Sequence, residues 1–175
     1  MVDFTVHRDV VIGVGNPLMG DDGLGIVAVA RLRERWSDDD TLVLIDGGTW
    51  GMNILPLIEC ARRLLIIDAI DDGLPPGSRI ELERDDIPRY LGRTLSPHQL
   101  DLREVMAVAE LRGTLPVETI AVGVQPQHIG LSLNLSPVVA AKLPGLLADL
   151  EEQLERWGHA RSPRHSTFDL RPSDA

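Results

Sequence analysis

The sequence predicts a three-layer α/β sandwich, in which a mostly parallel, twisted sheet of about five strands carries helices on both faces. Short apolar runs rich in β-branched residues recur along the chain, and segments with helical spacing separate them. The composition adds a second indication, because 43% of the residues are hydrophobic and only 3% are aromatic. Aliphatic runs of this kind are typical of strands that helices cover on both sides. Strands that alternate with helices indicate a layered α/β domain.

Four of these runs are expected to be buried parallel strands, and they cover residues 10–14, 42–45, 64–67 and 119–124. A fifth segment, residues 78–83, alternates apolar and charged residues after a turn rich in glycine and proline. Alternation of this kind leaves one face of a strand in water. We therefore expect the fifth strand at an edge of the sheet.

Apolar residues at helical spacing predict the covering helices. The first helix should begin near Asp22 or Gly23 and end near Trp36, and residues 52–61 and 100–111 should form two more. A serine followed by proline, Ser136-Pro137, is a helix-start signal that opens a long final helix reaching Trp157. Pro144 interrupts this last helix and should kink it or split off its first turns.

The length of 175 residues fits one domain with a core of its own, which we place at residues 1–158. Beyond Gly158 the chain is polar, contains proline and lacks periodicity, so we expect residues 159–175 to form a flexible tail. The net charge of −10 repels phosphate backbones and anionic membrane surfaces, which argues against nucleic acid and membrane partners. Without a leader-like or membrane-spanning segment, the expected compartment is the cytoplasm.

Acidic residues stand at or just after the ends of three predicted strands, and they are the first candidates for a functional site. Asp22, Asp46 and Asp68 should reach one edge of the sheet, since ligands of parallel sheets gather at the carboxyl ends of the strands. Such a negative crevice favours a cation. Asp21 or Asp22 can instead serve the start of a helix, and Asp46 can satisfy amides of a turn. Asp68 stands in an apolar stretch, where an unpaired carboxylate would cost several kcal/mol, so it needs a partner.

A histidine completes a candidate metal site. His98 precedes a predicted helix, and an imidazole with the carboxylates of Asp22 and Asp68 suits a borderline divalent ion such as nickel or zinc. A lone loop histidine is more commonly a surface or capping residue. His128, which follows the last predicted strand, is a reserve candidate.

The pair Gly13 and Gly15 after the first strand suggests a dinucleotide site, but the pattern is incomplete. Leu18 occupies the place of the third glycine, and Asp21 and Asp22 would set two carboxylates near the pyrophosphate. A partial glycine pattern is weak evidence, so a nucleotide site is disfavoured.

Five motifs carry a family resemblance, and the match in order and spacing extends from about residue 10 to 157. They are GVGNPLMGDDGLG (13–25), DGGT followed by Gly51-Met52 (46–52), LIIDAI (65–70), SPHQ (96–99) and GVQP (123–126). In order and spacing the chain resembles the hydrogenase maturation endopeptidases. The resemblance implies a single α/β peptidase domain that removes the C-terminal extension from the large-subunit precursor of a nickel-iron hydrogenase after nickel insertion.

The resemblance also implies roles for individual residues. The metal triad falls on Asp22, Asp68 and His98, and it would recognise nickel that the precursor supplies, with zinc or cadmium as surrogates. Asp46 is then the catalytic candidate, and Asn16, Gly47, Gly48 and Thr49 would form the loops that contact substrate and the developing oxyanion. No serine, cysteine or HExxH arrangement offers another nucleophile, so we expect an aspartic-type hydrolysis by water. A non-catalytic chaperone that binds the nickel-loaded precursor is the alternative.

Overall fold

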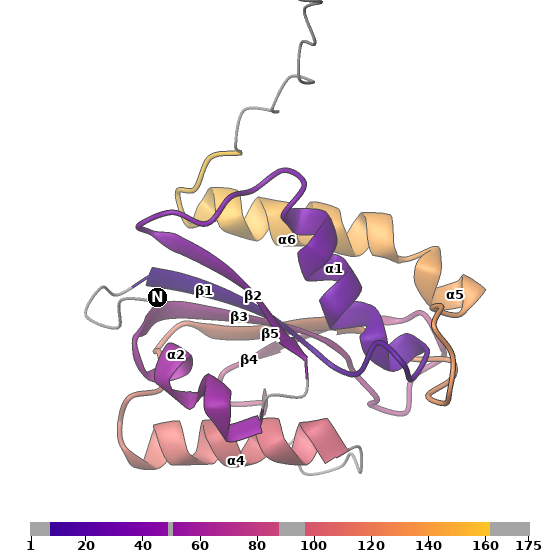
Figure 1. The fold of residues 1–175 in the computed structure, drawn as a ribbon, viewed down its shortest axis with the longest axis horizontal. Coiled ribbons are helices and arrows are strands. Elements are labelled where there is room, and N and C mark those ends of the chain that lie inside the picture. Colours follow the sequence, from indigo (N-terminus) through magenta and orange to yellow (C-terminus); the bar gives the residue numbers. More distant parts are fainter. Residues whose placement is uncertain (1–7, 49–50, 88–96, 162–175) are drawn as a thin grey trace, which may run out of the picture.

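The computed structural model describes residues 8–48, 51–87 and 97–161, and among these it leaves out the side chains of residues 97–101 and 103. One sheet lies between two helical layers (Figure 1). Helices α1 and α6 cover one face, and α2 and α4 cover the other. The three-layer α/β sandwich predicted from the sequence is therefore confirmed.

The elements follow in chain order: β1 (Arg8–Val14), η1 (Asp21–Gly23), α1 (Leu24–Leu32), β2 (Leu42–Gly48), η2 (Gly51–Ile54), α2 (Leu55–Glu59), β3 (Ala61–Ala69), β4 (Arg79–Glu83), α4 (Pro97–Leu111), β5 (Thr119–Val124), α5 (Pro137–Ala140) and α6 (Leu143–Arg156).

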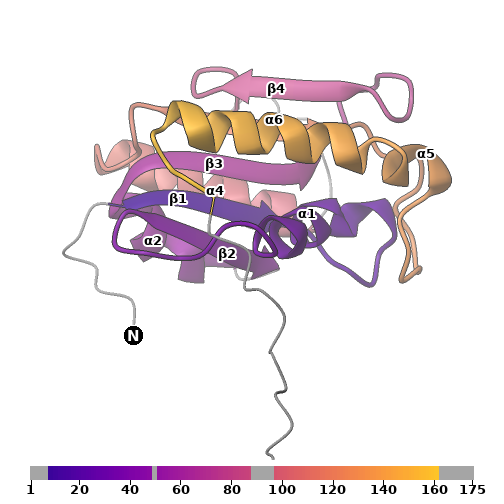
Figure 2. The ribbon, with the colours of Figure 1, turned by 90° about the horizontal axis from the view of Figure 1, so that it is seen from above.

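The five strands follow the order β2-β1-β3-β5-β4. Strands β1, β2, β3 and β5 pair in parallel, whereas β4 pairs with β5 in antiparallel register and closes one edge (Figure 2). The expected edge position of the fifth strand is confirmed. Its alternating burial, with Ile80 buried and Arg79 and Glu81 exposed, is the physical reason.

The sheet separates two apolar cores. Side chains alternate between the faces of each strand, so Leu64 and Ile66 of β3 enter the core under α2 and α4. Leu65 and Ile67 enter the core that β3 shares with α1 and α6. Both cores consist almost entirely of aliphatic side chains, as the composition indicated.

Helix α1 lies unusually close to the sheet, because two glycines face each other there. A Cβ atom at Gly25 would lie 2.2 Å from the Ile67 carbonyl oxygen and 2.4 Å from that of Val14. A Cβ atom at Gly13 would lie 2.2 Å from the carbonyl oxygen of Gly25. The start of α1 is thereby fixed against the carboxyl ends of β1 and β3.

Several boundaries differ from the predicted ones. Helix α1 ends at Leu32 rather than near Trp36, because the amides of Glu34 and Arg35 bond to carbonyl groups three residues back and so tighten the turn that follows the helix. The final helix divides into α5 and α6, and Pro144 lies in the first turn of α6, as its missing N–H group permits. The 52–61 segment is a 3₁₀ turn followed by a short α2.

A buried carboxylate joins the N-terminal strand to the end of the last helix. Asp9 of β1 is fully buried and accepts hydrogen bonds from Arg62, Arg63 and the Nε2 atom of His159. Burial opposes its ionisation, but these bonds dominate, and the pKa of Asp9 lies far below the usual range. His159, which we assigned to the tail, lies against Asp9 at 2.7 Å, whereas residues 162–175 of that tail lie outside the described residues.

Candidate functional site

The four parallel strands end on the same side of the sheet, near α5 on the right of Figure 1. We call this side, where the carboxyl ends of the strands and the loops after them lie, the carboxyl edge of the sheet. The candidate carboxylates Asp22, Asp46 and Asp68 all lie at this edge. Asp46 and Asp68 are the third-last and second-last residues of β2 and β3, so the strands extend slightly beyond the predicted ends.

The loop after β1 is built around Asp21, which is fully buried. Its carboxylate accepts hydrogen bonds from the backbone amides of Gln127, His128 and Ser136, at distances of 2.6 to 2.9 Å. Burial raises the cost of ionising this group, but these backbone hydrogen bonds outweigh it and place the pKa below its usual value. Asp21 therefore holds the loop that follows β5, and it does not cap α1 as the sequence suggested.

Asp22 lies beside Asp21 in η1 and is 2% exposed. Its Oδ2 atom accepts a hydrogen bond of 2.9 Å from the backbone amide of Asn16. A Cβ atom at Gly15 would lie 1.8 Å from the carbonyl oxygen of Asp22, so only glycine permits this close return of the loop. Asn16 in turn accepts from the amide of Leu18, and the candidate residues Asn16 and Asp22 thus belong to one hydrogen-bonded loop.

Asp68 is also 2% exposed and lies opposite Gly123 of β5. Its Oδ1 atom accepts a hydrogen bond of 2.8 Å from the backbone amide of Ala69. Along β3 its side chain alternates with Ile67 and Ala69, so it shares the face of Ile66, which α2 and α4 cover. Strands β1 and β3 are neighbours, and η1 contacts β3, which brings Asp22 and Asp68 to adjacent strand ends.

Asp46 is exposed and lies on β2, the edge strand opposite β4. It pairs with Gly13, and the register shifts directly after this pair, so that Gly48 pairs with Val14 and Gly47 has no partner in the register. By strand alternation Asp46 shares the face of Leu44, under α1, whereas Asp68 lies on the opposite face. The structure brings both aspartates to one edge of the sheet, but it places them on different faces.

Two further predicted residues fall outside what the structure describes. Thr49 is one of them, and the side chain of His98 is the other. The backbone places His98 at the second position of α4, on the sheet face that also carries Asp68. Among the side chains that the structure describes, no three His, Cys, Asp or Glu residues form a group that could hold a metal ion.

The reserve candidate His128 is exposed and packs against Gly130, where a Cβ atom would lie 2.5 Å from Nε2. Its backbone amide donates to Asp21, and its carbonyl oxygen accepts from the Asp21 amide. His128 therefore contributes to the loop through its backbone.

Gln125 arranges the loop that follows β3. Its buried side chain accepts hydrogen bonds from the amides of Asp72 and Leu74 and donates to the carboxylate of Asp71. These bonds hold the 71–74 loop at the end of β5, next to the strand that carries Asp68. No role for Gln125 was predicted from the sequence. Its position directly after the apolar strand β5 is the signal that could have marked it as a residue that arranges a loop.

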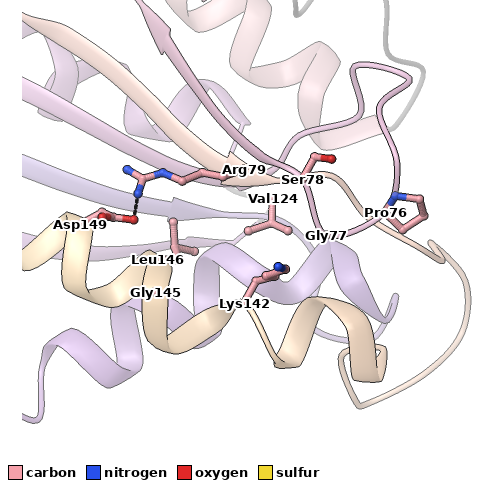
Figure 3. Close-up of a pocket in the computed structure, with 9 residues that line it drawn as sticks. All are labelled: Pro76, Gly77, Ser78, Arg79, Val124, Lys142, Gly145, Leu146 and Asp149. Carbon is pink, nitrogen blue, oxygen red and sulfur yellow. Dashed lines mark ion pairs between the residues drawn. The ribbon is translucent and has the colours of Figure 1, made fainter.

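A groove of about 390 Å³ lies away from these residues, between the start of β4 and helix α6. Figure 3 shows the ion pair of Arg79 with Asp149 at one end and Lys142 near Gly77. None of the predicted site residues lines this groove, so it is separate from the candidate site.

Comparison of the fold with solved structures identifies the class of protein. The structure described as the hydrogenase maturating endopeptidase HybD from E. coli superimposes with a TM-score of 0.84 and 32% identity, over 90% of this chain and 98% of that one. A second E. coli structure, titled as the solution structure of an endopeptidase, gives a TM-score of 0.83 at 30% identity, over 91% of this chain and 99% of that one. The fold is that of an α/β endopeptidase.

The sequence relatives identify the family. The model of the hydrogenase maturation protease family matches residues 26–153. HoxM of Cupriavidus necator, a hydrogenase expression/formation protein, is 35% identical over 95% of this chain and 82% of its own length. The hydrogenase 2 maturation protease of Escherichia coli is 32% identical over 93% of this chain and 99% of its own length. The chain belongs to the hydrogenase maturation protease family and is an endopeptidase, as its motifs indicated.

Proposed function

We propose that this endopeptidase removes the C-terminal extension from the large-subunit precursor of a nickel-iron hydrogenase once nickel has been inserted. The observation that carries the proposal is the pair of buried carboxylates, Asp22 and Asp68, at adjacent strand ends of a hydrogenase maturation protease. Carboxylates are rarely buried without a partner, and buried acids at the strand ends that form a ligand crevice are candidates for a functional site. The names of the relatives refer to hydrogenase formation and maturation, and they indicate the class of substrate that we propose.

The nickel ion belongs to the substrate in this proposal, and Asp22, Asp68 and His98 recognise it. Two carboxylates and an imidazole provide the oxygen and nitrogen ligands that a borderline divalent ion accepts, and zinc or cadmium would serve as surrogates. Helix α4 supports the assignment, because it covers the sheet face of Asp68 and carries His98 in its first turn. Three protein ligands leave positions for groups of the precursor.

Asp46 is the proposed general base of the hydrolysis. Its exposure makes it accessible to a water molecule and a substrate strand. The backbone beside it supports an oxyanion role, since β2 is an edge strand whose alternate N–H groups point away from β1. In this reading the amides near Gly47 and Gly48, together with Asn16 and Thr49, would contact the scissile carbonyl.

The described chain contains no helix that is long and apolar enough to cross a membrane. We place the reaction in the cytoplasm, where the single cysteine, Cys60, would stay reduced. Family membership favours proteolysis over the alternative of a precursor-binding chaperone.

Intact mass spectrometry tests the proposal. The purified enzyme is incubated with the nickel-loaded precursor, and the mass of the precursor is followed over time. A mass loss equal to a C-terminal peptide supports the protease, whereas an unchanged mass with a stable complex supports the chaperone. The Asp46→Asn variant, whose exposed side chain contributes little to the core, is expected to bind the precursor and cleave it at least about 100-fold more slowly.

A further inference from the structure

Exposed apolar side chains gather at the carboxyl edge of the sheet. The described chain exposes eight large apolar side chains, and six of them lie in segments that directly follow parallel strands. The six are Leu18, Met52, Leu74, Ile129, Leu131 and Leu133. This edge also holds the candidate site, so apolar exposure and the proposed chemistry share one side of the molecule.

The loop between β5 and α5 carries the most exposed of these residues. Leu131 is 89% exposed, Leu133 is 78% exposed and Ile129 is 37% exposed; we call these three residues the apolar ridge. The surrounding residues 127–137 contain no Asp, Glu, Lys or Arg, although a quarter of the chain is charged. Several strongly exposed apolar residues in one uncharged loop make this loop a candidate interaction site.

The apolar ridge is held in place by the loop that carries the candidate ligand. The Asp21 carboxylate accepts hydrogen bonds from three backbone amides within residues 127–136. The Gly20 amide donates a hydrogen bond of 2.8 Å to the Ser132 carbonyl oxygen. The Ser132 amide donates to Leu18 at 3.0 Å. Because Asp22 follows Asp21 directly, the loop of the ridge is joined by these hydrogen bonds to the loop of the candidate site.

We propose that the apolar ridge docks an uncharged, apolar segment of the hydrogenase precursor and positions the precursor for cleavage. The inference rests on the proposed function. The enzyme carries a net charge of −10, and its carboxyl edge adds buried carboxylates, so an acidic segment would be repelled there. The same net charge attracts a basic segment to the protein as a whole, but residues 127–137 contain no carboxylate that could pair with it on the ridge. An apolar segment, whose burial releases water from Leu131 and Leu133, is the partner that this chemistry favours.

The test compares two double variants in steady-state cleavage of the nickel-loaded precursor. The ridge variant carries Leu131→Ser and Leu133→Ser. The control carries Leu111→Ser and Val117→Ser. Leu111 is 88% exposed and ends α4, and Val117 is 86% exposed and precedes β5, so both lie on the side of the sheet where β5 begins, away from the carboxyl edge. We expect the ridge variant to raise KM by about 10- to 100-fold with little change in kcat, and the control to behave as the unmodified enzyme.

The possible outcomes separate the two proposals. Failure of the unmodified enzyme to cleave the precursor overturns the proposed function. Normal cleavage by the unmodified enzyme with equal KM for the ridge and control variants overturns the docking proposal alone, and so does a loss confined to kcat. Sedimentation of the unmodified enzyme as a dimer that the ridge variant abolishes would assign the ridge to a second copy instead. If the double variant melts at a lower temperature, the single Leu131→Ser variant replaces it in the same comparison.

Discussion

The carboxylate of Asp21 accepts a hydrogen bond of 2.6 Å from the backbone amide of Ser136, a residue 115 positions later in the chain. Ser136 is the N-cap of α5, where its own side chain accepts from the amide of Val139. One buried acid thus connects the loop after β1, the loop after β5 and the start of α5. This connection joins the segment of the candidate ligand Asp22 to the segment of the apolar ridge.

Asp21→Asn tests this unit. An amide group presents only one acceptor oxygen, so at least one backbone amide now faces an NH₂ group inside a buried site. We expect a loss of about 2–3 kcal/mol in the free energy of unfolding, measured by urea denaturation. Asp40→Asn, at an exposed loop position, is the control and should change the stability by less than about 0.5 kcal/mol. Equal stability of both variants would contradict the assigned role of Asp21.

Two glycine-to-alanine substitutions should act in opposite directions. Gly25→Ala places a methyl group against two backbone carbonyl oxygens that cannot move without separating α1 from the sheet. We expect it to destabilise the protein by about 3 kcal/mol. Gly145→Ala in α6 meets nothing within 4 Å and should stabilise the protein by about 0.5–1 kcal/mol through helix propensity. Urea denaturation of both variants at pH 7 measures the difference, and a common sign for the two effects would refute the packing argument.

Stability should fall in acid because of Asp9. Its folded pKa is lowered, as is that of Asp21, so both groups contribute stability that is present above the unfolded pKa of about 4. This contribution is lost as the pH falls through the folded values. We expect the urea midpoint to be level between pH 7 and 5 and to decrease steadily below about pH 4. The Asp9→Asn variant should start lower and show a smaller decrease, and a flat profile of the unmodified protein down to pH 3 would rule out this linkage.

His98→Ala should abolish precursor processing without unfolding the protein. The residue lies in the first turn of α4, and we propose that its role is in the site rather than in the fold. We expect a change of less than about 1 kcal/mol in the free energy of unfolding and a loss of at least about 100-fold in the cleavage rate. Thermal melting and the processing assay are run on the same sample. Retained cleavage would remove His98 from the ligand set, and unfolding would make it structural.

The fold was predictable because its signals are local. The apolar runs of β1, β3 and β5 identify buried strands from their own residues, and the alternation of Arg79, Ile80 and Glu81 identifies an edge strand without knowledge of its neighbours. The order of strand and helix then limits the topology. The split of the last helix followed in the same way from Pro144.

The partners of the buried acids were not predictable, because they are distant in sequence. Asp21 or Asp22 was expected to serve the start of a helix, whereas the partners of Asp21 lie 106 to 115 residues away. Asp9 was not among the residues singled out from the sequence, because its partners are far away along the chain. Arg62 and His159 lie 53 and 150 residues from Asp9 in the sequence and approach it only in the folded chain. The candidate residues Asp22 and Asp68 were found from position alone, because the topology of a parallel sheet brings strand ends together.

Parallel mass measurements on two precursors test whether the enzyme requires nickel in its substrate. The enzyme is incubated with nickel-loaded and nickel-free precursor of the same sequence, and the intact mass of each is recorded at matched times. We expect loss of the C-terminal peptide from the nickel-loaded precursor and no change in the nickel-free one. Cleavage of both precursors at equal rates would contradict recognition of nickel through Asp22, Asp68 and His98.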